Sequence, residues 1–159
     1  MVCIDMDIRR ATLEDAKAAC GVIRRSIADL CEPDHRGDPT TIDRWLSNKT
    51  PENVATWIGA AGNIVLVAID DGEVLGVAAM TSIGHITLNY VSPEHRFRGV
   101  SKALLTRLEG EAVKLGLSEL SLQSTKTARR LYRAAGFVEE PDAARPDDIC
   151  MVKLLGDSP

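Results

Sequence analysis

The sequence predicts a mixed α/β fold, in which a mostly antiparallel central sheet carries helices on both of its faces. Two β-rich runs, residues 64–69 and 73–82, flank the pair Asp71-Gly72, which favours a tight turn and therefore an antiparallel hairpin. Farther along, a helical pattern over residues 99–115 separates two more β-rich runs, as in a strand–helix–strand unit. An antiparallel first half joined to such a unit implies a mixed sheet between two layers of helices.

The first element in order is a strand over residues 3–10, where apolar and polar residues alternate loosely. Thr12 and Asp15 then form a capping-box pattern, in which Asp15 reaches back to the cap residue Thr12. Behind this pattern, apolar residues at helical spacing predict a helix that ends by Glu32-Pro33; they are Ala16, Ala19, Cys20, Ile23, Ile27 and Leu30.

A charged loop over residues 32–39 leads to two shorter helices, predicted at 41–48 and 52–60. The run Thr50-Pro51-Glu52 supplies the second helix with a cap, a first-turn proline and a first-turn acid. The hairpin described above follows these helices.

The second half of the chain alternates strands and helices. Pro93 ends a strand predicted over 85–91, and Gly116 ends the helix of residues 99–115. The apolar face of that helix comprises Val100, Leu104, Leu105, Leu108, Ala112 and Leu115. The remaining predicted elements are a strand at 117–123, a short helix carrying Ala128, Leu131, Tyr132 and Ala135 that Gly136 ends, and closing strands at 137–139 and 149–154.

Composition indicates one soluble globular domain over residues 1–159, with 45% apolar and 26% charged residues. A net charge of −4 argues against a nucleic-acid binder, and no apolar run reaches the roughly 18 residues that span a bilayer. Because the N-terminus has no signal-peptide pattern, we expect a cytoplasmic protein without membrane partners. The four cysteines lack CxxC spacing, so we expect reduced, mostly buried thiols and no metal site.

Residues 96–105, RFRGVSKALL, place one glycine among three cations at the start of a predicted helix. A helix N-terminus offers unpaired N–H groups and the positive end of the helix dipole, which suits an anion such as a phosphate. Gly99 allows close approach of the backbone, while Arg96, Arg98 and Lys102 add positive charge. The patterns GxxxxGK[ST] and GxGxxG are absent, which argues against ATP, GTP and the common dinucleotides. A helix start that merely carries solvated basic residues is the alternative.

Two motifs resemble those of the GNAT superfamily of acetyl-CoA-dependent N-acetyltransferases. In that family V-x-P precedes Q/R-x-x-G-x-G/A and a helix; here Val91-Ser92-Pro93 precedes Arg96-Phe97-Arg98-Gly99-Val100-Ser101, with Ser101 in the final small position. The second motif, N/S-x-x-A-x-x-[FL]-Y-x-x-x-G-F, is similar to residues 125–137, with Thr125 in its first position. The resemblance covers about residues 64–139, and the motifs occur in the order found in the family.

The resemblance implies a GNAT-like fold and direct transfer of an acetyl group from acetyl-CoA to a primary amine of a small molecule or peptide. It also implies that the strand ending at Val91 and the strand at 117–123 splay apart, with acetyl-CoA in the gap. The Val91 N–H would donate to the thioester carbonyl, whose oxygen gains negative charge during attack. The positions that match the family's binding residues are Val91, Arg96, Phe97, Arg98, Gly99, Val100, Ser101, Lys102 and Thr125.

Tyr132 matches the family's tyrosine that protonates the departing CoA thiolate, since a phenol still holds its proton at neutral pH. Packing of its ring beside Leu131 is the alternative role. No carboxylate lies between His85 and Tyr90, so His85 and His35 are the candidates for the base that deprotonates the amine.

Other functions stay open on the sequence alone. A non-catalytic acyl-CoA-binding or regulatory module would keep the phosphate-binding loop and lack a working base. A nucleic-acid binder would fit the acidic composition poorly and would bind with steep salt dependence; its arginines would be Arg96, Arg98, Arg129, Arg130 and Arg133. A homodimer is compatible with the resemblance, and nothing in the sequence identifies the amine acceptor.

Overall fold

A seven-stranded sheet organises the chain, with strand order β1-β2-β3-β4-β5-β7-β6. The computed structural model describes residues 6–30, 38–95, 98–125, 128–140 and 149–155. Its strands are β1 (Asp7–Arg10), β2 (Asn63–Asp70), β3 (Glu73–Thr81), β4 (His85–Val91), β5 (Glu119–Ser124), β6 (Val138–Glu139) and β7 (Ile149–Leu154). Of the strand pairs in these ranges, β4 and β5 run parallel and all others run antiparallel. The predicted mixed, mostly antiparallel sheet is therefore confirmed.

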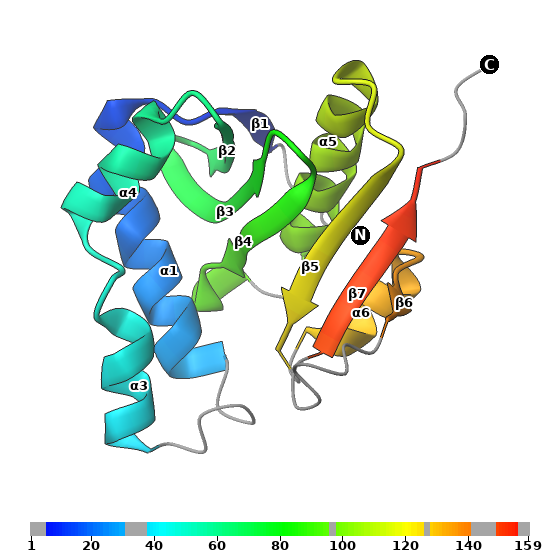
Figure 1. The fold of residues 1–159 in the computed structure, drawn as a ribbon. Coiled ribbons are helices and arrows are strands. Elements are labelled where there is room, and N and C mark those ends of the chain that lie inside the picture. The colour runs from blue at the N-terminus through cyan, green and yellow to red at the C-terminus, as the bar shows by residue number, and fades with distance from the viewer. Residues whose placement is uncertain (1–5, 31–37, 96–97, 126–127, 141–148, 156–159) are drawn as a thin grey trace.

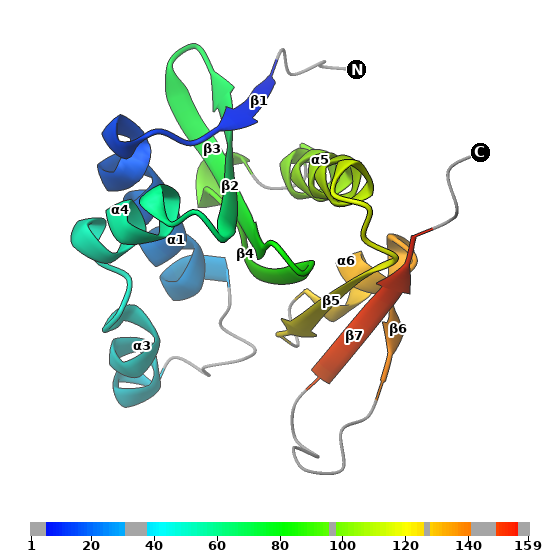
Figure 2. The same cartoon turned by 45° about the horizontal axis from the view of Figure 1, so that its top comes forward.

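Helices cover both faces of this sheet (Figures 1 and 2). They are α1 (Ala16–Leu30), α3 (Pro39–Leu46), α4 (Pro51–Gly59), α5 (Val100–Lys114) and α6 (Arg129–Ala134), with 3₁₀ turns η1 (Leu13–Asp15) and η2 (Pro93–His95). Side chains of α1, α3 and α4 pack on one face, and those of α5 and α6 pack on the other. None of the helices in the described ranges combines the length and apolarity that a membrane crossing requires.

The core forms two layers because the central strands are buried on both faces. On β2, Ile64 and Leu66 pack on the α5 side, whereas Val65 and Val67 pack on the α1 side. A strand buried on both faces has no polar face to show, so its sequence is a nearly continuous apolar run. The run over residues 64–69 has this form.

Gly76 on β3 determines how closely α5 approaches the sheet. A Cβ added to Gly76 would lie 2.8 Å from Val100 Cγ1, 2.9 Å from Leu104 Cδ1 and 3.1 Å from the Tyr90 carbonyl oxygen. A larger residue would force Val100, Leu104 or the Tyr90 backbone to shift, so glycine allows the first two turns of α5 to lie directly on β3. The N-terminus of α5 is thereby held beside the end of β4.

The predicted elements are confirmed, with small shifts at several ends. Helix α3 begins at Pro39 rather than residue 41, because the Asp38 side chain accepts a hydrogen bond from Thr40 N and caps the helix two residues earlier. The helix predicted behind the capping-box pattern starts with a 3₁₀ turn, and the carboxylate of Asp15 accepts from Thr12 N at 2.7 Å as predicted. The predicted positions of Cys3 and Cys31 lie outside the described residues.

The ion pair at the start of the chain gives a pH-dependent prediction. Arg9 donates from Nη1 and Nη2 to the two carboxylate oxygens of Asp15, at 2.7 and 3.0 Å. These bonds hold the pKa of Asp15 at about 2, well below its usual 3.8. A lowered carboxyl pKa stabilises the fold above about pH 4, and this contribution disappears as the pH falls toward about 2.

We therefore expect Asp15→Asn to lower the free energy of unfolding by about 1 kcal/mol at pH 7, a value reduced because Arg9 is half-exposed. Urea unfolding between pH 7 and about pH 2 should show the difference from wild type shrinking toward the acid end. Asp43→Asn, at an exposed position on α3, is the matched control. A difference that does not change with pH, or one shared by the control, would contradict the role of this ion pair.

Candidate functional site

Strands β4 and β5 separate shortly after they begin to pair. Their parallel register joins only His85 to Ser121 and Ile86 to Leu122. Beyond these pairs β4 continues along β3 and β5 continues along β7, so a gap opens between them. A cavity of about 60 Å³ occupies the gap; its lining residues include Ile86, Thr87, Asn89, Tyr90, Leu122, Thr125 and Tyr132. The splay implied by the family resemblance is thus present.

The backbone of Val91 faces this gap. Ser92 N donates to Leu75 O on β3 at 2.8 Å, so the Ser92 N–H points away from β5. Successive N–H groups along a strand point to opposite sides, and the Val91 N–H therefore points toward β5. Because the paired part of β5 ends beside Ile86, no strand of the described residues lies next to Val91 on that side. The Val91 N–H is therefore a hydrogen-bond donor directed into the gap.

A β-bulge at Thr87 decides which β4 side chains reach the gap. Ala79 pairs with Leu88 and Met80 pairs with Ile86, which leaves Thr87 as the extra residue. The bulge reverses the alternation of the strand: Ile86 packs in the α5-side core, whereas Leu88 and Tyr90 lie on the α1 side. Asn89 is consequently turned toward α5 and α6.

Tyr132 reaches the gap from α6. Its side chain is buried, and its ring packs edge-on against Phe137 with a centroid distance of 5.5 Å and an interplanar angle of 67°. Burial raises the pKa of the Tyr132 hydroxyl, and the nearby Asn89 amide acts more weakly in the opposite direction. The ring therefore has the packing role considered for it, and the same side chain also lines the cavity.

Asn89 is a site residue that sequence reasoning missed. Its Oδ1 accepts a hydrogen bond from Ser101 Oγ at 3.0 Å, which links the end of β4 to the first turn of α5. Its Nδ2 is buried and forms no hydrogen bond of normal geometry with a described residue, although the amide lies close enough to the Tyr132 hydroxyl to lower its pKa. A buried amide with an unused donor is costly unless a ligand accepts from it. No sequence signal distinguishes Asn89, because the bulge that turns it inward is not encoded by a motif.

The N-terminus of α5 begins at Gly99, which has a left-handed backbone conformation with φ of +78°. A Cβ added to Gly99 would have no heavy atom within 4 Å, so the space beside this residue is open. Arg98 and Lys102 are exposed and form no ion pair with any described residue. The predicted binding residues Arg96 and Phe97 lie outside the described residues.

The Thr125 hydroxyl accepts from Ala128 N at 3.1 Å, in the turn that leads into α6. This contact stabilises the turn that precedes α6. Thr125 also lines the cavity between the splayed strands. The turn therefore brings one predicted binding residue and Tyr132 to the same gap.

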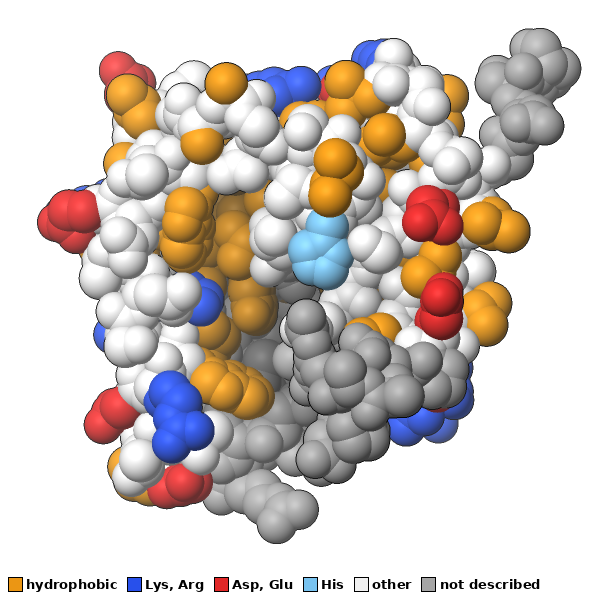
Figure 3. Space-filling view, in the orientation of Figure 1, with side chains coloured by type: hydrophobic (Ala, Val, Ile, Leu, Met, Phe, Trp, Pro, Cys, Tyr) orange, Lys and Arg blue, Asp and Glu red, His pale blue; other side chains and the backbone are white. Residues whose placement is uncertain are grey.

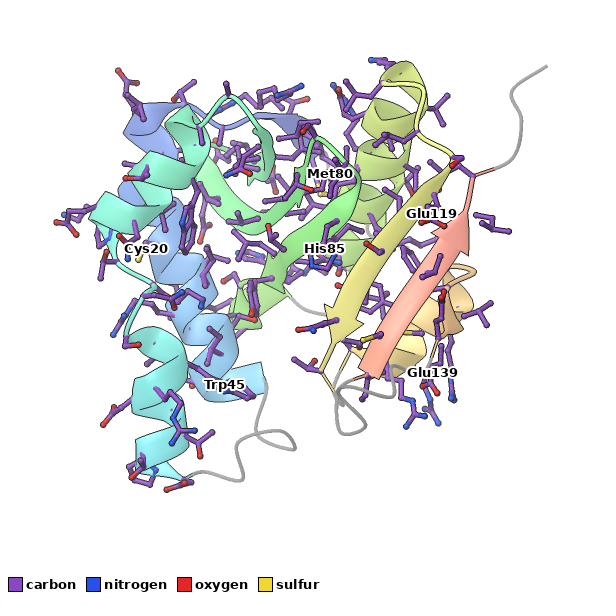
Figure 4. The ribbon with its side chains drawn as sticks, in the orientation of Figure 1. Cys20, Trp45, Met80, His85, Glu119 and Glu139 are labelled. Atoms are coloured by element: carbon purple, nitrogen blue, oxygen red, sulfur yellow. The ribbon has the colours of Figure 1, made fainter. Side chains whose placement is uncertain are left out.

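His85 lies where β4 and β5 separate. Its Nδ1 lies 3.0 Å from Ser121 Oγ, and no partner for its Nε2 is found among the described residues. In Figures 3 and 4 His85 stands at the edge of a hollow between the sheet and the helices α3 and α4. The other candidate base, His35, lies outside the described residues. The side chain of His95 is 15% exposed and lies between Glu73 and Arg98.

The hollow in Figure 3 is a groove formed by the α3–α4 connection, residues 47–50, and by β4. Two cavities of about 510 and 290 Å³ make up the groove, and both are lined by Asn48 and Lys49. Helix α1 holds this connection in place: Arg24 Nη1 donates to Leu46 O and Lys49 O, and the Cys20 thiol donates to Lys49 O at 3.2 Å. We call this surface the α3–α4 groove.

Comparison with known proteins agrees with this geometry. A family model described as "Acetyltransferase (GNAT) domain" matches residues 33–154. No curated protein sequence is similar enough to be counted as a relative.

Several solved structures share the fold. One is the PaiA N-acetyltransferase of Thermoplasma acidophilum in complex with coenzyme A, with a TM-score of 0.81, 21% identity and coverage of 94% of this chain and 99% of that chain. Another is a GCN5-related N-acetyltransferase from Rhodopseudomonas palustris, with a TM-score of 0.83, 23% identity and coverage of 98% and 99%. An acetyltransferase from Thermus thermophilus gives a TM-score of 0.72 at 18% identity, covering 98% of this chain and 100% of that chain.

Proposed function

Because this chain belongs to the GNAT family of acetyltransferases, we propose that it transfers the acetyl group of acetyl-CoA directly to a primary amine of a small molecule or peptide. The observation that carries the proposal is the gap between β4 and β5, which the Val91 N–H and the Tyr132 side chain approach from two different elements. Acetyl-CoA supplies an activated thioester carbonyl when it is bound. All further steps are assigned to side chains and backbone groups of the chain itself.

The residues present suit a phosphate-bearing thioester. We assign the pyrophosphate to the N–H groups of the first turn of α5, where the space beside Gly99 is open and the helix dipole favours negative charge. Arg98 and Lys102, which form no ion pair with any described residue, add attraction, and the family pattern adds Arg96 and Phe97. Thr125 and the unused Nδ2 donor of Asn89 lie along the gap, where they would bind the pantetheine arm.

The Val91 N–H is assigned to the carbonyl oxygen of the thioester. Negative charge develops on that oxygen as the amine attacks, and a fixed donor aimed at it stabilises the transition state without reorganising. Such a donor typically lowers the barrier by about 3 kcal/mol. Hydrogen bonds of β4 to β3 hold this part of the backbone rigid, so the donor is preorganised.

Tyr132 is assigned as the acid that gives its proton to the departing thiolate. Burial raises the pKa of its hydroxyl, so the proton stays on the oxygen throughout the neutral range and is present when the thiolate forms. The contact between the Tyr132 and Phe137 rings holds the phenol in position. Deprotonation of Tyr132 is not expected to limit the rate below about pH 10.

His85 is assigned as the base that removes the proton from the amine. When its Nδ1–H donates to Ser121 Oγ, the lone pair of Nε2 is left to accept that proton at the edge of the α3–α4 groove. His35 stays a second candidate from the sequence. His85 adjoins the point where the strands separate, so its substitution tests this assignment directly.

We expect His85→Ala to lower kcat by about ten- to a hundred-fold and to remove the decline of the rate at low pH, because protonated imidazole cannot act as a base. The low-pH decline is measured from the rate–pH profile with an amine that the wild-type enzyme acetylates. The matched control is His95→Ala, which removes a histidine that lies between Glu73 and Arg98. Retention of the low-pH decline in His85→Ala would assign the proton transfer to His35, to water or to the substrate.

A coupled assay of thiol release from acetyl-CoA over a panel of primary amines tests the proposed function. Release that depends on an amine, with the acetylated amine identified by mass spectrometry, supports it. Binding of acetyl-CoA by calorimetry without release for any amine would instead identify a non-catalytic acyl-CoA-binding module.

A further inference from the structure

The α3–α4 groove adjoins the gap between β4 and β5 at two places. Thr87 and Leu88 line both the gap and the smaller groove cavity, and Tyr90 and Thr125 line both the gap and the larger one. A molecule bound in the groove therefore lies beside the gap in which acetyl-CoA is assigned. Since Lys49 lines both groove cavities, it lies beside any such molecule.

The side chains that line the groove carry positive charge, whereas the chain as a whole is negative. Arg44 and Lys49 line the groove, while no carboxylate is among the described residues that line the groove or the gap. The chain as a whole carries a net charge of −4, so a lining without carboxylates does not follow from composition. Figure 3 shows basic side chains on the wall and at the foot of the hollow, and acidic ones only beyond its margin.

Lys49 is half-buried and has no anionic partner among the described residues. Its Nζ donates to Asn48 Oδ1 at 2.6 Å, and it forms no ion pair within the described part of the chain. Burial lowers the pKa of the Lys49 ammonium, which reflects the cost of keeping this charge away from water. Buried cations are usually paired, so an anionic ligand at this position would relieve that cost.

Apolar side chains form the rest of the groove. Trp57, Ala79 and Leu88 line the smaller cavity, and Ile27 and Trp45 line the larger one. A ligand that fits here has an apolar body of moderate size together with its charged groups. A polycation would place additional positive charge beside Arg44 and Lys49 and would be disfavoured.

Building on the proposed function, we propose that the acceptor is a primary amine that also carries a carboxylate and an apolar side group, as in an apolar α-amino acid, and that Lys49 binds the carboxylate. The amine of the acceptor then faces the gap between β4 and β5, and the apolar group of the acceptor contacts Trp57 and Leu88. Lys49 is a specificity-determining residue in this arrangement. It takes no part in the chemical step.

The test compares acceptors that differ only in the carboxylate. L-Phenylalanine is compared with L-phenylalaninamide, L-leucine with L-leucinamide, and 1,4-diaminobutane serves as the dication. The amides lose their ammonium proton more readily than the amino acids, so their intrinsic reactivity works against the expected result. We expect kcat/KM of the wild-type enzyme to favour the amino acids by about 10- to 100-fold, the usual value of a hydrogen-bonded charge pair.

Lys49→Met should abolish this preference, and Lys49→Glu should reverse it toward the amide and the diamine. Lys17→Met, at an exposed position on α1, is the matched control and should keep the wild-type preference. A wild-type preference for the amides or the diamine would overturn the inference. An unchanged preference in Lys49→Met would overturn it as well.

A binding measurement separates this inference from the proposed function. If no amine releases thiol, the proposed function fails, and saturation-transfer NMR on the CoA-loaded protein then tests the groove directly. Tighter binding of the amino acid than of its amide, lost in Lys49→Met but kept in Lys17→Met, would support the inference. Equal binding of the two, or no binding of either, would overturn it.

Discussion

Tyr132→Phe is expected to lower kcat by about 10² to 10⁴, the usual effect of removing a positioned general acid. The ring keeps its edge-on contact with Phe137, because only the hydroxyl is lost. Asn89 Nδ2 forms no hydrogen bond of normal geometry within the described residues, so at most a weak contact with the hydroxyl is lost, and we expect the free energy of unfolding to change by about 1 kcal/mol or less. Steady-state kinetics, calorimetry with acetyl-CoA and urea unfolding together measure these three quantities.

The role of the Tyr132 hydroxyl is identified by whether its loss changes kcat or the affinity for acetyl-CoA. A loss confined to kcat, with unchanged affinity for acetyl-CoA, is expected of a general acid. Phe137→Leu is the control for packing: it removes the ring contact, keeps the hydroxyl and should affect stability more than kcat. A loss of affinity with normal turnover in Tyr132→Phe would make the hydroxyl a binding contact, and unchanged values of both would exclude the assignment.

Gly99→Glu is expected to weaken acetyl-CoA binding by about 100-fold or more, because a carboxylate beside the pyrophosphate adds repulsion of several kcal/mol. The space next to Gly99 is open, so the substitution causes no clash in the free protein. The left-handed backbone at φ of +78° adds strain of about 1 to 2 kcal/mol, which a domain of ordinary stability tolerates. Isothermal calorimetry with acetyl-CoA measures the affinity, and circular dichroism checks the fold.

Helix α5 offers a matched control for this substitution at its other end. Gly116 follows the helix, has φ of +76° and likewise has no heavy atom within 4 Å of an added Cβ. Gly116→Glu therefore introduces the same charge and similar strain far from the assigned pyrophosphate, and it should bind acetyl-CoA as wild type does. Equal affinity of both variants and wild type would contradict the phosphate assignment at the α5 N-terminus.

Much of the fold follows from patterns that are local in the sequence. The hairpin turn at Asp71-Gly72, the cap at Thr50 and the 3.6-residue periodicity of residues 99–115 each depend on neighbours within a few positions, and each is confirmed. The proposed phosphate-binding loop is also local, because a helix N-terminus and its preceding glycine are contiguous in the chain. For the same reason, two short motifs were enough to indicate the family.

The sequence alone therefore determined the element order, the family and the candidates Gly99 and Tyr132. The tertiary structure decided which side chains meet at the gap and in the groove: Asn89 bonds to Ser101 twelve positions later, and His85 meets Ser121 across the parallel pair. Lys49 enters the site because α1 holds the α3–α4 connection against the groove. Periodicity indicates which face of an element is buried, but it does not specify the bulge, the register or the partner that brings distant polar groups together.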